Sequence, residues 1–202
     1  MAEAAELQQL STFLRLWQVY DPAVKSDLYS TAVESGARLF LIDPVPLAAD
    51  SLAELAAGAR VAGVLVTNSN HPRAAASFGR QFAAPIYAAA PVVEALEGEK
   101  TVSITDGEEI FPGLTAVALP GGAPGEMAFH FAEEGGTMVV GDALIHFEPY
   151  GFALLPAKYC TDQKALRRSL RRLLDWPFER LLFAHGTPIL SSARARLETL
   201  LL

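Results

Sequence analysis

The sequence predicts an α/β fold, in one domain that spans residues 1–202. Two observations indicate this class. Apolar strand-like runs alternate with amphipathic helix-like runs along the chain, and no low-complexity linker or repeat interrupts them. Of the 202 residues, 51% are hydrophobic, which is enough apolar material for one sizeable core. We therefore expect helices packed on sheets in layers around that core.

The first half of the chain provides strands and short helices in turn. Residues 27–47 are typical of two strands joined by a turn at Glu34 to Ala37, where Gly36 can adopt a positive φ at no steric cost. Asp50 is then predicted to cap a short helix that ends at Gly58. The elements expected next are a buried strand at 64–66, a helix from Ala74 to Phe82, a strand from Ile86 to Ala88 and a helix that starts at Pro91.

The second half begins with short strands and ends with helices. Strands are expected within residues 101–110, 114–119 and 127–142, with turns at Asp106-Gly107 and Gly135-Gly136. A helix with Asp162 near its start follows, then a strand from Leu181 to Ala184 and a closing helix after Ser191 and Ser192. The arginines of the first of these helices are predicted to lie on its solvated face, opposite inward leucines: Arg167, Arg168, Arg171 and Arg172, opposite Leu166, Leu170, Leu173 and Leu174.

Charge and composition exclude several classes of partner. A net charge of -7 argues against nucleic acid, which needs clustered Lys and Arg. The single cysteine, Cys160, excludes an internal disulfide framework and fits a reducing compartment. The acidic N-terminal residues 1–10 do not resemble a secretory signal, and no run is long enough to span a bilayer. We therefore expect a cytoplasmic protein with no membrane partner, and the apolar composition is compatible with a homodimer.

Polar loops follow several of the predicted strands, and their order along the chain is informative. They are "TNSNHPR" at 67–73, "LPGGAPGE" at 119–126, "GDALIH" at 141–146 and "AHGTP" at 184–188. This series resembles the landmarks of the metallo-β-lactamase superfamily: THxHxDH, a histidine in a PGHTPG-like turn, a strand-terminal GD, and a late GH or HG. "FLIDPVPL" and "APIYA" also match, so the resemblance covers most of the chain. It implies a four-layer αββα sandwich.

The superfamily's chemistry uses two divalent metals, usually zinc, and this chain departs from its ligand pattern. Thr67 matches the threonine of the motif, and Asp142 and His185 resemble the bridging aspartate and the late histidine. The other ligand positions hold residues unsuited to the role: Asn68, Asn70 and Arg73 for histidines of the first loop, Pro72 for its aspartate, and Gly122 for the histidine of the middle turn. Since three protein ligands are the usual minimum for catalytic zinc, we expect no metal and no cofactor.

Two functions compete on this pattern. The favoured one is a non-hydrolytic pseudoenzyme. It binds a small anionic ligand or a protein partner in the cleft that holds the metals in the superfamily, with Arg73 and His185 as anchors. The alternative is an active metallo-hydrolase with a rebuilt single-metal zinc site at Asp142 and His185, completed by His71 or by His146. That alternative requires one loop histidine to turn inward.

The candidate cleft residues are Asn68, Asn70, His71, Arg73, Asp142, His146 and His185. Most of them could instead have a purely structural role. The asparagines can satisfy loop backbone groups, Asp142 can cap its own loop, and His185 can belong to a turn. His71 is expected to be an exposed loop residue unless the register shifts, and His130 to be structural. A buried carboxylate needs a counter-charge, so we predict that Arg73 forms an ion pair with Asp142 in the vacated metal site.

Overall fold

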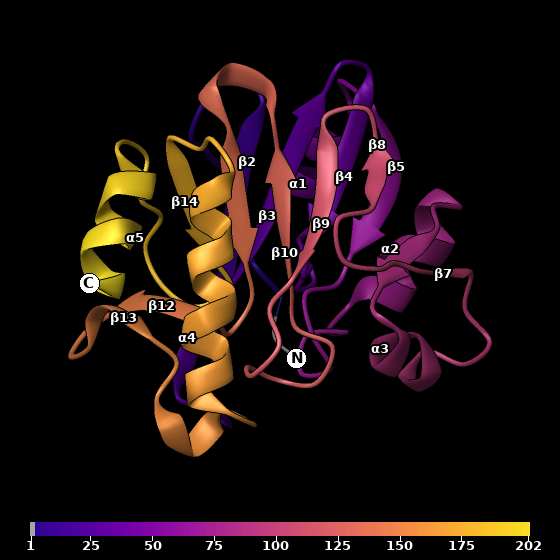
Figure 1. The fold of residues 1–202 in the computed structure, drawn as a ribbon. Helices are drawn as coiled ribbons and strands as arrows, with labels where there is room; N and C mark the ends of the chain where they lie inside the picture. Colours follow the sequence, from indigo (N-terminus) through magenta and orange to yellow (C-terminus); the bar gives the residue numbers. More distant parts are fainter. Residues whose placement is uncertain (1–2) are drawn as a thin grey trace.

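Strands and helices of the computed structural model, which describes residues 3–202, form four layers (Figure 1). One sheet has seven strands in the order β1-β2-β3-β4-β5-β6-β7, and a second has five in the order β14-β11-β10-β9-β8. Helices α4 (Gln163–Arg172) and α5 (Ala193–Leu201) lie over the five-stranded sheet. Helices α1 (Ala49–Ala56), α2 (Ala75–Phe82) and α3 (Ala90–Ala95) pack on the seven-stranded sheet. The predicted αββα sandwich is confirmed.

Both sheets mix antiparallel and parallel pairs. In the larger sheet the strands are β1 (Gln8–Gln9), β2 (Leu14–Asp21), β3 (Ser26–Ser35), β4 (Arg38–Ile42), β5 (Arg60–Leu65), β6 (Ile86–Ala88) and β7 (Thr101–Ser103). In the smaller sheet they are β8 (Glu109–Phe111), β9 (Leu114–Ala118), β10 (Met127–Phe131), β11 (Thr137–Val140) and β14 (Arg180–Phe183); β12 (Leu144–Phe147) and β13 (Gly151–Leu154) form a separate hairpin. The parallel pairs are β4 to β5, β5 to β6, β6 to β7 and β11 to β14.

Three hydrophobic clusters fill the three spaces between the four layers. Along β4, Leu39 and Leu41 belong to the cluster beneath helices α1 to α3, whereas Phe40 and Ile42 belong to the cluster between the sheets. Successive side chains of a strand point to opposite faces, so an uninterrupted apolar run serves a strand that is covered on both sides. The third cluster joins the five-stranded sheet to α4 and α5.

Local signals in the sequence locate most elements, with one wrong assignment. Gly36 has a φ of 59° in the turn between β3 and β4, as the sequence predicts. Asp162 caps α4, since its side chain accepts hydrogen bonds from the backbone N–H groups of Lys164 and Ala165. The prediction that Asp50 caps α1 is wrong: the N-cap is Ala48, without a side-chain hydrogen bond, and Asp50 lies in the first turn.

The helix faces and the terminus complete the comparison. On α4 and the turn after it, Leu166, Leu170 and Leu173 are buried as predicted, while Arg168 is exposed on the opposite face. Within residues 3–202, no helix combines the length and the apolarity needed to cross a membrane. The prediction that no secretory signal is present rests on residues 1–10, and the first two of these lie outside the described part of the chain.

Candidate functional site

The site lies where strands of both sheets end. Asp43 follows β4, and Thr67 follows β5 after Val66, so the parallel pairing of β4 with β5 brings the two residues together. The Thr67 N–H donates to Asp43 Oδ1 at 2.8 Å, and the Thr67 hydroxyl donates to Oδ2 at 2.5 Å. Asp142 and His185 follow β11 and β14, which are also paired in parallel. A backbone hydrogen bond from Met127 N to Thr67 O joins the two sheets here.

His71 is buried, with 3% of its surface exposed, so its assignment as an exposed loop residue is wrong. Its Nδ1 lies 3.0 Å from Asp43 Oδ2 and 2.9 Å from Thr67 Oγ1, and its Nε2 lies 3.2 Å from Asp142 Oδ1. Burial and the charge of Arg73 act to lower the pKa of His71, but the Asp142 and Asp43 carboxylates outweigh them and raise it to about 9. The two carboxylates therefore stabilise the imidazolium form of His71.

His185 also faces Asp142, next to His71. Its Nε2 lies 3.3 Å from Asp142 Oδ1, and its Nδ1 lies 3.2 Å from the Asp27 carbonyl oxygen. The His71 and His185 ring centroids are 5.5 Å apart. Both rings thus have an oxygen acceptor at Nδ1 and point Nε2 at the same carboxylate oxygen.

The second oxygen of Asp142 is held by two amides. Asn70 Nδ2 donates to Asp142 Oδ2 at 3.0 Å, and Asn68 Nδ2 approaches the same oxygen at 3.3 Å. Asn68 Oδ1 also accepts from the Asn70 backbone N–H, so Asn68 both supports the loop and contacts the site. Burial acts to raise the pKa of Asp142, yet protonated His71 and the hydrogen bonds of His185 hold it well below its usual range.

The predicted ion pair between Arg73 and Asp142 is wrong. Arg73 has a φ of 39°, and its guanidinium donates to the carbonyl oxygens of Tyr29 at 2.7 Å and Asp43 at 2.9 Å. A third, longer contact reaches the Ala184 carbonyl at 3.5 Å. Arg73 therefore ties strand ends together, and His71 supplies the counter-charge for Asp142.

The remaining histidines lie outside this cluster. His146 Nδ1 is 2.6 Å from the Thr187 carbonyl oxygen, and its ring packs on Phe183. His130 Nε2 is 2.7 Å from the Pro177 carbonyl oxygen, which supports the predicted structural role. His71 is thus the loop histidine that turns inward.

Two acidic residues of the site, Asp43 and Glu126, were missed as site residues by the sequence analysis. Asp43 occupied the strand-terminal position in "FLIDP", and that position was the signal that pointed to it. Glu126 is 3% exposed and accepts hydrogen bonds from Asn68 Nδ2 at 3.0 Å and Ala143 N at 3.1 Å. Burial and the Asp142 carboxylate raise the pKa of Glu126 to about 8. Its only signal was an acid directly after the "GGAPG" turn, beside the apolar strand β10.

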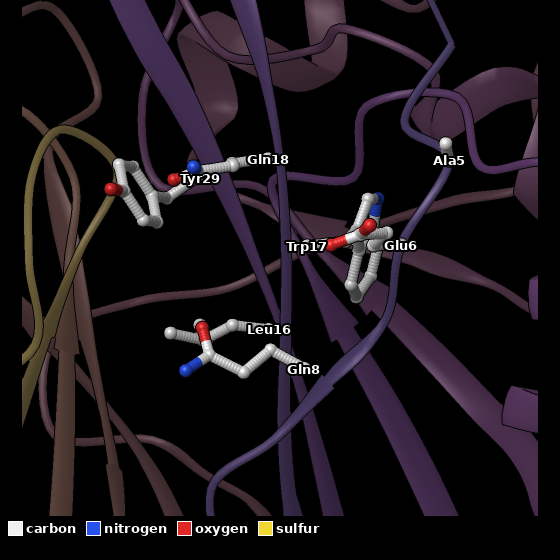
Figure 2. Close-up of a pocket in the computed structure, with 7 residues that line it drawn as sticks. All are labelled: Ala5, Glu6, Gln8, Leu16, Trp17, Gln18 and Tyr29. Atoms are coloured by element: carbon white, nitrogen blue, oxygen red, sulfur yellow. The ribbon is translucent and has the colours of Figure 1, made fainter.

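A separate pocket of about 280 Å³ lies beside β2 and β3 (Figure 2). It is lined by Ala5, Glu6, Gln8, Leu16, Trp17, Gln18 and Tyr29. It includes neither Asp142 nor the histidines of the cluster. Its link to the cluster is Tyr29, whose carbonyl accepts from Arg73.

The cluster has the chemistry of a metal-binding set. One ligand atom from each of His71, Asp142 and His185 lies within 4.8 Å of the others. Two imidazoles and one carboxylate provide the three protein ligands that a catalytic zinc usually has. Ligating histidines usually donate their other N–H to a carboxylate or a carbonyl, and here Asp43 and Asp27 offer those acceptors. The residues present therefore fit one divalent ion.

Fold and site together define an αββα protein with polar loops that meet where strands of its two sheets end. The profile of the metallo-beta-lactamase superfamily matches residues 10–201, and the chain belongs to that superfamily. No curated protein sequence matches this chain.

Solved structures show the same fold at low sequence identity. The DIM-1 metallo-beta-lactamase is 13% identical, with 99% of this chain and 97% of that chain covered and a TM-score of 0.77. A metallo-beta-lactamase from Erythrobacter litoralis is 15% identical, with 100% and 97% covered and a TM-score of 0.76. A metallo-beta-lactamase family protein from Thermus thermophilus is 22% identical, with 95% and 79% covered and a TM-score of 0.69.

Proposed function

We propose that this protein is a metal-dependent hydrolase with a single-metal site formed by His71, Asp142 and His185. The observation that carries the proposal is the inward position of His71, whose Nε2 lies 3.2 Å from Asp142 Oδ1, the same oxygen that His185 Nε2 faces at 3.3 Å. It supplies the third ligand that the sequence pattern lacked. A bound divalent ion such as zinc would supply Lewis-acid chemistry for hydrolysis.

The protein's own residues hold these ligands in place. Asp43 and the Asp27 carbonyl fix the two rings through Nδ1, and Asn68 and Asn70 hold Asp142 through Oδ2, which leaves Oδ1 for the ion. The His185 side chain is 15% exposed and that of Asp142 11%, so solvent reaches one side of the cluster. A substrate would approach the ligands from this side.

The second candidate is the non-hydrolytic pseudoenzyme, and one observation favours it. Asn68 and Asn70 contact Asp142 on Oδ2, and His71 and His185 contact it on Oδ1, so protein groups alone can satisfy both oxygens of the carboxylate. Arg73 is engaged with backbone carbonyls, which leaves His185 as the anchor for a small anionic ligand or a protein partner.

Metal analysis of tag-free protein separates the two. Chelator-treated protein is titrated with Zn²⁺ or Co²⁺ and its metal content is measured, and the loaded protein is assayed with ester, amide and phosphodiester substrates. We expect one ion per chain in the wild type, loss of binding in His185→Ala, and normal binding in the control His146→Ala, which removes an imidazole outside the cluster. Substoichiometric metal at micromolar protein would contradict the hydrolase proposal and favour the pseudoenzyme.

A further inference from the structure

Glu126 is a buried carboxyl group that contacts no member of the candidate metal-binding set in the described hydrogen bonds and ion pairs. It accepts hydrogen bonds from three loops: from Asn68 Nδ2 at 3.0 Å, from Ala123 N at 3.2 Å and from Ala143 N at 3.1 Å. These donors belong to the loop after β5, the turn before β10 and the loop after β11. One side chain thus connects the segments that carry His71 and Asp142.

The space around Glu126 is made by two glycines. A Cβ at Gly122 would lie 3.1 Å from Glu126 Cγ and Oε2, and a Cβ at Gly141 would lie 2.7 Å from Oε1. Gly122 is the position where the superfamily pattern has the histidine of its middle turn. The Glu126 side chain therefore occupies the space that a side chain at position 122 would need.

The contacts of Glu126 lead to Asp142 by two routes. Asn68 Nδ2 lies between the carboxyl groups, 3.0 Å from Glu126 Oε2 and 3.3 Å from Asp142 Oδ2. Ala143, whose N–H donates to Glu126 Oε1, is the next residue after Asp142. Both the side chain and the backbone of Asp142 are therefore oriented by groups that bind Glu126.

We infer that Glu126 is a positioning residue that holds Asn68 and the loop after β11 so that Asp142 faces His71 and His185. It acts through these partners and is not a catalytic residue. The inference rests on the proposed function only for its effect on metal affinity, because the contacts that Glu126 organises are all between residues of this chain.

The sharpest variant is Glu126→Gln, which keeps the size and shape of the side chain. All three partners are N–H donors: Asn68 and Ala123 bond Oε2, and Ala143 bonds Oε1. The amide oxygen of glutamine can replace only one of these two oxygens, and its NH₂ group would face an N–H donor at the other. Glu97→Gln is the matched control at an exposed position. Glu126→Asp keeps the carboxyl group but withdraws it from these donors, and it serves if the glutamine variant does not fold.

Two readouts are taken on protein shown to be folded by circular dichroism. In chelator, the imidazole resonances of His71 and His185 should move in Glu126→Gln and stay in place in Glu97→Gln. Affinity for Co²⁺ should fall by about 10–100-fold in Glu126→Gln, the usual effect of losing a group that orients a ligand. Combining it with Asn68→Ala should cost less than the product of the two single losses, because the residues share one hydrogen bond.

The outcomes separate the two proposals. Unchanged imidazole resonances in a folded Glu126 variant overturn the positioning role, whether or not the protein binds metal. If the wild type binds no Co²⁺, the proposed hydrolase function fails, and the resonances alone then decide the role of Glu126. A variant that moves the resonances but binds Co²⁺ with wild-type affinity would limit the role to the metal-free protein and overturn its link to metal binding.

Discussion

The loss of unfolding free energy caused by His71→Gln should depend on pH. In the metal-free protein the pKa of His71 is raised from 6.5 to about 9, against the effect of burial and through the Asp142 and Asp43 carboxylates. A shift of this size corresponds to roughly 3 kcal/mol, at about 1.4 kcal/mol per pKa unit. Because the folded-state pKa is raised, this stabilisation is complete below about pH 6.5 and is lost as the pH rises through about 9.

The assay is urea unfolding of the wild type and His71→Gln in chelator, at about pH 6 and about pH 9.5. The difference in unfolding free energy between the two proteins should shrink by roughly 3 kcal/mol from the lower to the higher pH. His130→Gln is the control, since the His130 ring bonds a backbone carbonyl and burial lowers its pKa. A difference for His71→Gln that does not vary with pH would refute the account of His71 as an imidazolium between two carboxylates.

Two further predictions concern the segments around the cluster. Arg73→Ala should destabilise the protein by about 3 kcal/mol, because two charge-assisted hydrogen bonds to part-buried backbone carbonyls are lost. In a double-mutant cycle with Asp142→Ala the coupling energy should fall well short of the roughly 3–5 kcal/mol typical of a broken buried ion pair, and a coupling of that size would mean that the two side chains are directly paired. Gly141→Ala should destabilise by about 1–3 kcal/mol and weaken metal binding, because its Cβ would collide with Thr67 Oγ1. Gly58→Ala, with open space around it, is the control, and equal stabilities of the two variants would contradict the prediction.

Much of the fold could be predicted because regular elements have simple periods. The uninterrupted apolar run from Leu39 to Ile42 indicates a strand covered on both faces, and the structure places it between two cores. Asp142 and His185 could be assigned to the site through the superfamily resemblance, and each follows an apolar strand directly. Their side chains start from positions that β11 and β14 fix.

The loop after β5 could not be predicted in the same way. It has no period, so the side to which each residue points depends on individual dihedral angles and on contacts distant in sequence. Arg73 adopts a φ of 39° and reaches carbonyls of β3 and the β4 end, while His71 turns to Asp43, which is 28 positions earlier. The superfamily pattern assigned these positions by register and therefore placed the counter-charge on the wrong residue. Glu126 was missed for a related reason, because its turn was interpreted only through its glycines.

The two sheets contribute different halves of the cluster. Asp43 and His71 follow strands of the seven-stranded sheet, whereas Asp142 and His185 follow strands of the five-stranded sheet. A ligand that contacts His71, Asp142 and His185 together can therefore bind only while the two sheets are packed on each other. Neither sheet alone provides the complete site. A ligand present at about 100 times its dissociation constant would add about 2.7 kcal/mol to the stability of the whole sandwich. Occupancy of this small site would therefore lower the fraction of molecules in which the two sheets separate.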